Sequence, residues 1–201
     1  IAKILGRCEF IEELKNERDN LSKVINEKLW DEETGFYYDL WKNGELSGVR
    51  HIGAFWALLS KCASEERAER LITHLTDEES FKTPNRIPAL AKSDKNFESG
   101  GNYWRGGVWA PTNYMVLKGL DKYKKYELAH EIAMDYLCAV VDVFKRTNTL
   151  FENYAPEYID GEFSKGNPAK PDFVGWTGLA PISIMFEYVF GIRPDAQNKK
   201  I

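Results

Sequence analysis

Apolar residues recur every three to four positions over most of the chain, which is the spacing of amphipathic helices. Polar and charged residues fill the positions between them, as expected where one helix face is buried and the other is solvated. The pattern predicts six helices, at about residues 9–29, 51–63, 64–75, 111–120, 126–144 and 173–190.

Local signals mark where several of these helices begin. Ser64, followed by Glu65 and Glu66, is typical of an N-cap with acids in the first turn. Pro111 suits the first turn of the fourth predicted helix. Pro181 lies inside the sixth and predicts either a kink or the true start of that helix.

Residues 30–44 have a different pattern. Aromatic residues lie between two turn signals, Gly35 and the pair Asn43-Gly44, and this arrangement predicts a short β-hairpin. The remaining segments lack periodicity and are expected to be loops.

The connections between the predicted helices alternate between long and short. In an array of neighbouring antiparallel helices, alternate connections lie at opposite ends, so all three long loops should share one end. These loops hold most of the aromatic, glycine and proline residues. The chain is therefore expected to be all-α, an α-hairpin toroid or solenoid with a functional site at its long-loop end.

Composition excludes several classes of protein. Hydrophobic residues make up 43% and charged residues 29%, which is ordinary for a globular domain. A net charge of −4 without a sustained basic run argues against nucleic-acid binding. No apolar run approaches the roughly 18 residues of a membrane span, and Ile1 to Leu5 lack the long apolar core of a signal peptide.

Cysteine and histidine residues give no sign of a metal site. Cys8, Cys62 and Cys138 form an odd set, and they are expected to be free, buried thiols. The odd number favours a reducing compartment, which makes the cytoplasm the weakly preferred location. The three histidines are scattered without short-spaced partners, so neither a metal nor a cofactor is expected.

The stretch most suggestive of chemistry is residues 102–114, NYWRGGVWAPTNY. Flat amphipathic rings stack on the C–H faces of a sugar, and a guanidinium can hold its hydroxyls or a carboxylate. The alternative interpretation is a buried aromatic core at a loop–helix junction.

Glu152 is the first candidate for catalysis. It lies in a long loop beside Phe151 and Tyr154, where apolar rings can tune a carboxylate to activate water. The alternative is a solvated surface glutamate. Glu157 is a weaker candidate of the same kind, and Asp31 is expected to be a cap or turn residue.

Residues 103–111, YWRGGVWAP, resemble glycoside hydrolase family 63 and its relatives, the trehalases among them. The family pattern has proline where this chain has Gly107, a change expected to loosen the loop without removing a contacting side chain. Three further stretches resemble the family in the same order: residues 25–39, 151–157 and 173–179.

The resemblance implies an inverting glycosidase that acts on α-glucosidic or related linkages of an oligosaccharide or glycoside. By position, Glu152 corresponds to the base. The expected sugar-binding residues are Tyr103, Trp104, Arg105, Trp109, Tyr154 and Trp176. The family's acid is an aspartate upstream of the matching region, so this segment alone is expected to be inactive.

The family fold, an (α/α)6 barrel, has twelve helices, and the six predicted here amount to about half of one. Residues 1–192 are expected to form this partial barrel, and residues 193–201 a tail that continues in a longer chain. The missing N-terminal half of the barrel would be its partner. A non-catalytic carbohydrate-binding or helical scaffold protein, or a repeat module without a sugar site, remain the alternatives.

Overall fold

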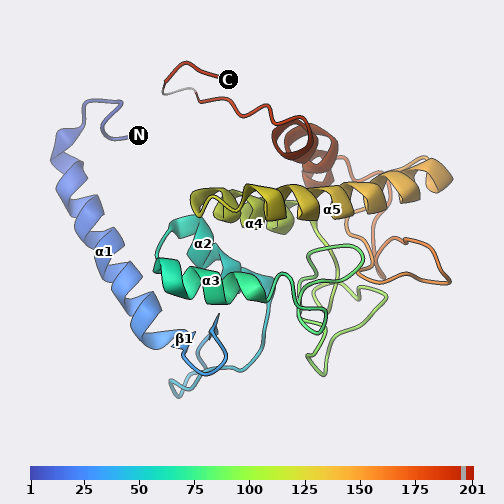
Figure 1. Ribbon diagram of the computed structural model, residues 1–201, viewed down its shortest axis with the longest axis horizontal. Helices are drawn as coiled ribbons and strands as arrows, with labels where there is room; N and C mark the ends of the chain where they lie inside the picture. The colour runs from blue at the N-terminus through green and yellow to red at the C-terminus, as the bar shows by residue number, and fades with distance from the viewer. Residues whose placement is uncertain (196–197) are drawn as a thin grey trace.

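The computed structural model describes residues 1–195 and 198–201, which form a mostly helical chain with one small two-stranded sheet (Figure 1). The helices are α1 (Ile11–Lys28), α2 (Trp56–Ser60), α3 (Glu65–Thr73), α4 (Ala110–Lys122) and α5 (Tyr126–Thr147). Four further helical segments are η1 (Cys8–Phe10), η2 (Ile52–Phe55), η3 (Trp176–Leu179) and η4 (Ala180–Val189). The hairpin consists of β1 (Trp30–Asp31) and β2 (Phe36–Tyr37), which are antiparallel.

The predicted helices are confirmed, with two adjustments. The Ser64 side chain accepts a hydrogen bond from the backbone N–H of Arg67, as an N-cap should. The segment expected at 51–63 is shorter, because it opens as the 3-10 turn η2 and ends where Lys61 adopts a left-handed φ of 61°.

The last predicted helix begins later than expected. Phe173 donates its backbone N–H to the carbonyl of Leu150, so residues 173–175 belong to the loop layer. The helix opens at Trp176 as η3 and continues from Ala180 as η4, which has π-helical hydrogen bonding. Pro181 stands in the first turn of η4, where its missing N–H costs no intrahelical bond.

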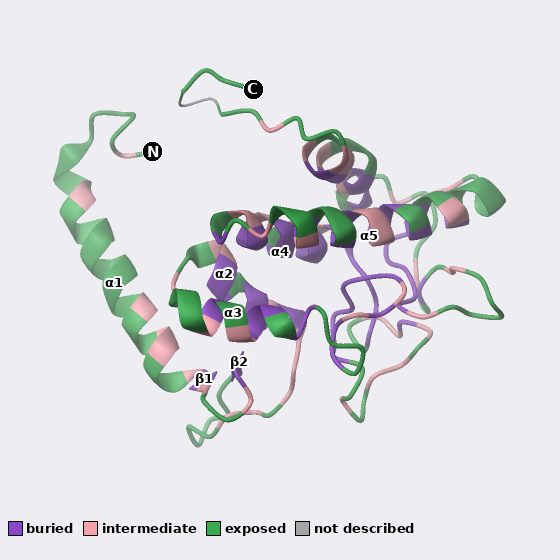
Figure 2. Cartoon of the chain, viewed as in Figure 1, coloured by how far each residue is buried: buried purple, intermediate pink, exposed green. Residues whose placement is uncertain are grey.

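The core is formed by buried residues of α2, α3, α4, α5 and η4 together with residues of the hairpin and the long loops (Figure 2). Gly119 allows α4 to approach α2 closely, because a Cβ there would stand 2.9 Å from the Leu58 Cβ. Both residues are buried. Gly119 therefore serves packing between helices.

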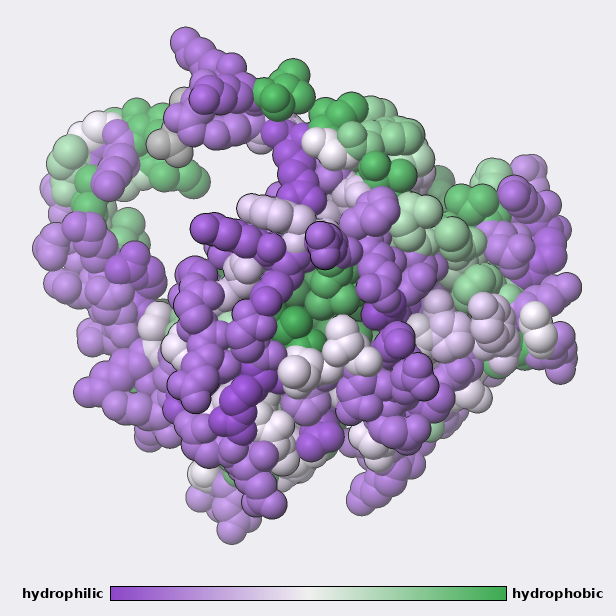
Figure 3. All heavy atoms as spheres, in the orientation of Figure 1, coloured by the Kyte–Doolittle hydropathy of each residue, from purple (hydrophilic) through white to green (hydrophobic). Residues whose placement is uncertain are grey.

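One apolar helix face has no partner within the described residues. Helix α1 contains no buried residue, and its apolar residues Leu14, Leu21 and Val24 are exposed. In Figure 3 hydrophobic atoms also gather over η4, where Ile182 and Phe186 are exposed. Such unpaired faces are what half of an (α/α)6 barrel would present.

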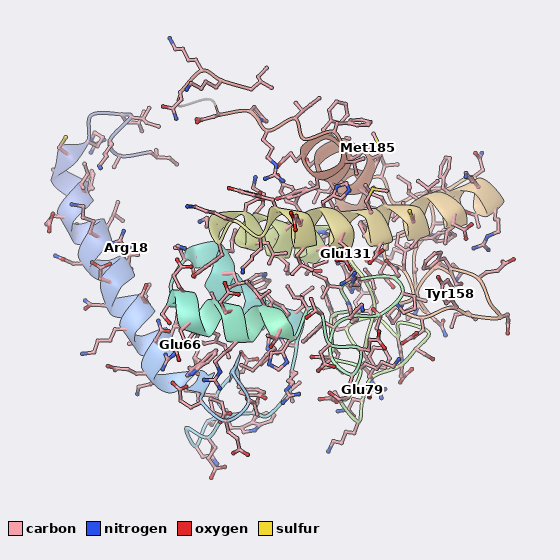
Figure 4. The ribbon with its side chains drawn as sticks, viewed as in Figure 1. Arg18, Glu66, Glu79, Glu131, Tyr158 and Met185 are labelled. Carbon is pink, nitrogen blue, oxygen red and sulfur yellow. The ribbon has the colours of Figure 1, made fainter. Side chains whose placement is uncertain are left out.

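The cysteines are free, but the expectation that they are buried is wrong for two of them. Cys8 and Cys138 are exposed, and Cys62 is half-buried. Cys138 lines an apolar groove of about 670 Å³ together with Met185 and Tyr158. Figure 4 labels Met185 and Tyr158. Cys138 stays exposed because this groove between α5, η4 and the loop at residues 158–163 is open to solvent.

The three long connections meet at one end, as the alternation of loop lengths predicts. Isolated β-bridges join His51 to Leu90, Pro88 to Val108, and Val108 to Tyr154, which links all three loops. In Figure 1 the second and third loops, green and orange, lie below α4 and α5, and the first, blue, lies below α3.

Candidate active site

The loop that carries Glu152 is fixed by backbone hydrogen bonds. Val108 and Tyr154 exchange two bonds of 2.9 and 3.0 Å, which join this loop to the 102–114 stretch. The N–H of Glu152 donates to the carbonyl of Lys170 at 2.9 Å. The carboxylate therefore projects from a main chain that is held on both sides.

The Glu152 side chain is 6% exposed and accepts a hydrogen bond from the Tyr103 hydroxyl at 3.2 Å. Desolvation, and then the hydrogen bond and charge of Glu152, raise the pKa of the Tyr103 hydroxyl above its usual range, and the protonated hydroxyl donates this bond. Tyr103 itself has a φ of 53°, which non-glycine residues rarely adopt and which is common at functional sites.

Four aromatic rings, including that of Tyr103, form one cluster beside Glu152. The Tyr103 ring meets those of Trp104 and Trp109 edge-on, at centroid distances of 5.8 and 4.7 Å. Trp104 stacks on Trp109 at 4.3 Å, and Trp176 meets Trp109 edge-on at 5.5 Å. Two separate segments of the chain thus supply one aromatic surface, and a third segment supplies the buried carboxylate beside it.

Exposure divides the expected sugar-binding residues into two groups. Trp104 is 49% and Trp176 is 37% exposed, so each leaves ring surface open to a ligand. Trp109 and Tyr154 are fully buried. The Tyr154 hydroxyl accepts the N–H of Phe151 at 3.1 Å, which places Tyr154 behind the loop as a support.

Arg105 makes its polar contacts away from this cluster. Its guanidinium pairs with Glu98 at 2.7 Å, and its Nε donates to the carbonyl of Asn96 at 3.1 Å. Both charged side chains are substantially exposed, so the ion pair adds little stability. Arg105 closes its own loop and does not contact Glu152.

The glycine that departs from the family pattern is sterically required here. Gly107 donates its N–H to the carbonyl of Tyr103 at 2.8 Å, and a Cβ at position 107 would stand 2.3 Å from that oxygen. The turn at Gly107 is thus tight and hydrogen-bonded in this chain.

Sequence reasoning missed Thr177. Its side chain is fully buried, and its hydroxyl donates to the carbonyl of Phe151 at 2.8 Å and lies 3.5 Å from that of Glu152. It therefore ties the helix that begins at Trp176 to the loop that carries Glu152. No local signal marks this role, since the partners are 25 and 26 residues apart.

The weaker acidic candidates have structural partners. Glu157 pairs with Lys92 at 2.9 Å. Asp31 accepts the N–H and hydroxyl of Thr34, which confirms its turn role. Within the described residues, no three metal-binding side chains gather closely enough to hold an ion, and no helix there combines the length and hydropathy needed to cross a bilayer.

Comparison with known proteins decides the family. The family model described as the mannosylglycerate hydrolase MGH1-like glycoside hydrolase domain matches residues 1–168. This chain belongs to that MGH1-like glycoside hydrolase family. Among curated proteins, it is similar to an uncharacterised protein of Borreliella burgdorferi, with 30% identity over the whole chain and 44% of the relative.

Other relatives of this MGH1-like chain include glycosidases. A probable mannosyl-oligosaccharide glucosidase of Schizosaccharomyces pombe is 27% identical over 93% of the chain and 24% of its own length. The cytosolic neutral trehalase of Kluyveromyces lactis is 29% identical over 80% and 23%. The chain thus spans less than half the length of these curated relatives.

Solved structures agree with this family assignment. A GH63 mannosylglycerate hydrolase of Thermus thermophilus, in complex with glucose, has a TM-score of 0.62 and 28% identity over 80% of this chain and 37% of that one. The neutral trehalase of Saccharomyces cerevisiae has a TM-score of 0.64 at 20% identity, over 82% and 28%, and supports the barrel fold alone. The fold is that of about half an (α/α)6 glycosidase barrel.

Proposed function

We propose that the protein containing this chain is an inverting glycosidase acting on an α-linked glycoside, with Glu152 as the base. The observation that carries the proposal is the buried Glu152 carboxylate, held by Tyr103 beside a partly exposed aromatic surface. The MGH1-like family and its glycosidase relatives support the same chemistry. Residues 1–192 are the barrel part of this proposal, and the rest of the chain is its tail.

In this reaction Glu152 accepts a proton from a water molecule as the water oxygen attacks the anomeric carbon. The bond between that carbon and the leaving oxygen breaks on the opposite face of the sugar. A second carboxyl group protonates the leaving oxygen, so the two groups exchange protonation states over the cycle. The low exposure of Glu152 and the nearby rings limit competing hydration of the carboxylate.

The aromatic cluster has a separate task in the proposal. Trp104 and Trp176 offer ring surface that can stack on the sugar, whereas Trp109 and Tyr154 hold the binding residues from behind. Arg105 already pairs with Glu98 through one Nη, so only its remaining N–H groups are available for the proposed sugar contact. Stacked C–H surface and hydroxyl contacts would suit an uncharged sugar.

The proposal places the acid outside this chain. The curated relatives are more than twice as long, so a segment that completes the barrel can supply the second carboxyl group. On this view the 201-residue chain binds sugar weakly and does not turn it over.

The test is the Glu152→Gln variant of the complete protein. Loss of a general base should lower kcat by about 10²- to 10⁴-fold while sugar binding persists. Glu157→Gln is the matched control, because this glutamate lies in the same loop but pairs with Lys92. Near-normal turnover by Glu152→Gln would refute the assignment, and a product with retained anomeric configuration would refute inversion.

A further inference from the structure

Trp41 is 57% exposed on a hairpin that the proposed reaction does not use. The hairpin spans residues 39–47 and is closed by a β-bridge between Leu40 and Leu46. The indole ring is therefore accessible to a ligand.

The exposure of Trp41 is built into a rigid turn. Its N–H donates to the carbonyl of Glu45 at 2.8 Å, and its own carbonyl accepts the N–H of Gly44 at 2.9 Å. Gly44 has a φ of 85°, which glycine adopts without strain. The ring is therefore presented by a fixed backbone, so binding would require little ordering of the loop.

Two cavities border this segment and share part of their lining. One of about 490 Å³ is lined by Asp39, Trp41, Ser47 and His51, among others. Another of about 790 Å³ shares Trp41 and Ser47 and extends to the loop at residues 93–96. Trp41 thus borders two cavities, each large enough to accommodate a sugar ring or another small molecule.

Polar groups in these cavities retain hydrogen-bonding capacity. The Arg50 Nε donates to the Tyr38 hydroxyl at 3.1 Å, but within the described residues its two Nη atoms form no hydrogen bond or ion pair. Asp39 contacts the His51 ring at 2.9 Å while its side chain stays 73% exposed. An aromatic face with a guanidinium and a carboxylate nearby is suited to hydroxyl groups.

The charges of the two cavities balance. Arg50 and Lys95 are cationic, and Asp39 and Asp94 are anionic. A ligand with one strong charge would meet both signs, whereas an uncharged polyhydroxylated ligand can use donors and acceptors alike. The chemistry of the lining therefore favours a neutral sugar over an acidic one.

The larger cavity also adjoins the loop of the candidate active site. Asn96 lines it, and the Asn96 carbonyl accepts the Nε of Arg105, two residues from the tyrosine that holds Glu152. A sugar chain extending from the reacting bond could thus follow the loop end of the molecule to Trp41.

We propose that Trp41, with Arg50 and Asp39, forms a second sugar-binding subsite that takes an uncharged saccharide unit beyond the bond that is cleaved. The proposal rests on the proposed function for the identity of the longer substrate. Binding at Trp41 can nevertheless be measured without turnover.

The test uses ¹⁹F NMR of the complete protein labelled with 5-fluorotryptophan. Trp41→Phe assigns the Trp41 resonance, and the probes are methyl α-D-glucopyranoside, methyl α-D-mannopyranoside and methyl α-D-glucuronide. The Trp41 resonance should shift saturably with at least one neutral glycoside. The glucuronide should bind no more tightly, and Arg50→Met should weaken the neutral glycoside about tenfold, as expected for one lost hydrogen-bonding group.

An unchanged Trp41 chemical shift with both neutral glycosides would refute the subsite. Tighter binding of the glucuronide than of the neutral glycosides would refute it as well. The result is independent of catalysis, because Glu152→Gln should leave the Trp41 shift unchanged. If Glu152→Gln abolishes turnover but no neutral glycoside shifts the Trp41 resonance, the subsite is refuted and the proposed glycosidase function is retained. If a neutral glycoside shifts the Trp41 resonance but Glu152→Gln remains active, the subsite is retained and the role of Glu152 as the base is refuted.

Discussion

The Tyr103 hydroxyl donates a hydrogen bond of 3.2 Å to the buried carboxylate of Glu152. Tyr103 adopts a left-handed φ of 53° to do so, and the N–H of Gly107 holds its carbonyl at 2.8 Å. A strained residue held by a tight turn is thus the direct contact of the proposed base.

Removing this hydroxyl should impair the reaction without unfolding the protein. Tyr103→Phe keeps the ring contacts with Trp104 and Trp109 but takes the donor from Glu152. We expect kcat of the complete enzyme to fall roughly 10- to 100-fold, the range for a hydrogen bond to a charged group. Tyr158→Phe, an exposed tyrosine, is the control. Equal rates for both variants would show that the contact has no role in catalysis.

Thr177 is expected to hold the loop that carries Glu152 in position, without contacting the substrate. Thr177→Val conserves shape but leaves the buried carbonyl of Phe151 without its donor, at a cost of about 1–3 kcal/mol in the free energy of unfolding. Because the Glu152 loop then loses its tie to the helix, kcat should fall more than KM rises. Thr177→Ser retains the hydroxyl and should restore much of the rate. If serine and valine variants behave alike, the hydroxyl is not what positions the loop.

The periodic parts of the fold were predictable because their interactions are local. The helices and the Ser64 cap follow from spacing within one or two turns. The pairing of Arg105 with Glu98, and of Thr177 with Phe151, depends on how irregular loops meet, and no periodicity encodes that.

Misassigned burial has a related cause. The sequence predicts that Cys138 is buried because it falls within a helical pattern, but the structure leaves it exposed in an open groove beside η4. Sequence patterns identify a face that needs a partner and not whether the same segment supplies it. For Glu152, the family resemblance singled out the residue, and burial beside Tyr103 is what the structure adds.

Alkaline pH should destabilise the chain through its buried tyrosines. Burial raises the pKa of Tyr154 to about 12, so the folded state keeps a proton that the unfolded state releases near pH 10. Its contribution is complete below pH 10 and is lost as pH rises towards 12, with about 1.4 kcal/mol gone at pH 11.

Denaturant unfolding at pH 8 and pH 11 checks this. Tyr154→Phe should lose less stability between the two pH values than the parent chain, whatever its stability at pH 8. Tyr158→Phe, which changes an exposed ring, should decline like the parent. A Tyr154→Phe decline as steep as the parent's would count against burial of that hydroxyl.

The turn at Gly107 gives the sharpest steric prediction. A Cβ there would stand 2.3 Å from the Tyr103 carbonyl and 3.1 Å from the Trp109 Nε1, so either backbone or indole must move. Gly107→Ala should therefore cost about 1–3 kcal/mol of stability, the usual range for overpacking. It should also displace Tyr103 and lower kcat.

Gly100→Ala is the matched control, because a Cβ at position 100 meets nothing within 4 Å. Thermal unfolding of both variants, with kcat of the complete enzyme, separates strain in the turn from a general effect of filling glycines. A third variant, Gly107→Pro, restores the family residue but removes the N–H that bonds to Tyr103. If it were as stable and active as the parent, the Tyr103 turn could not have the geometry on which the proposed position of Glu152 depends.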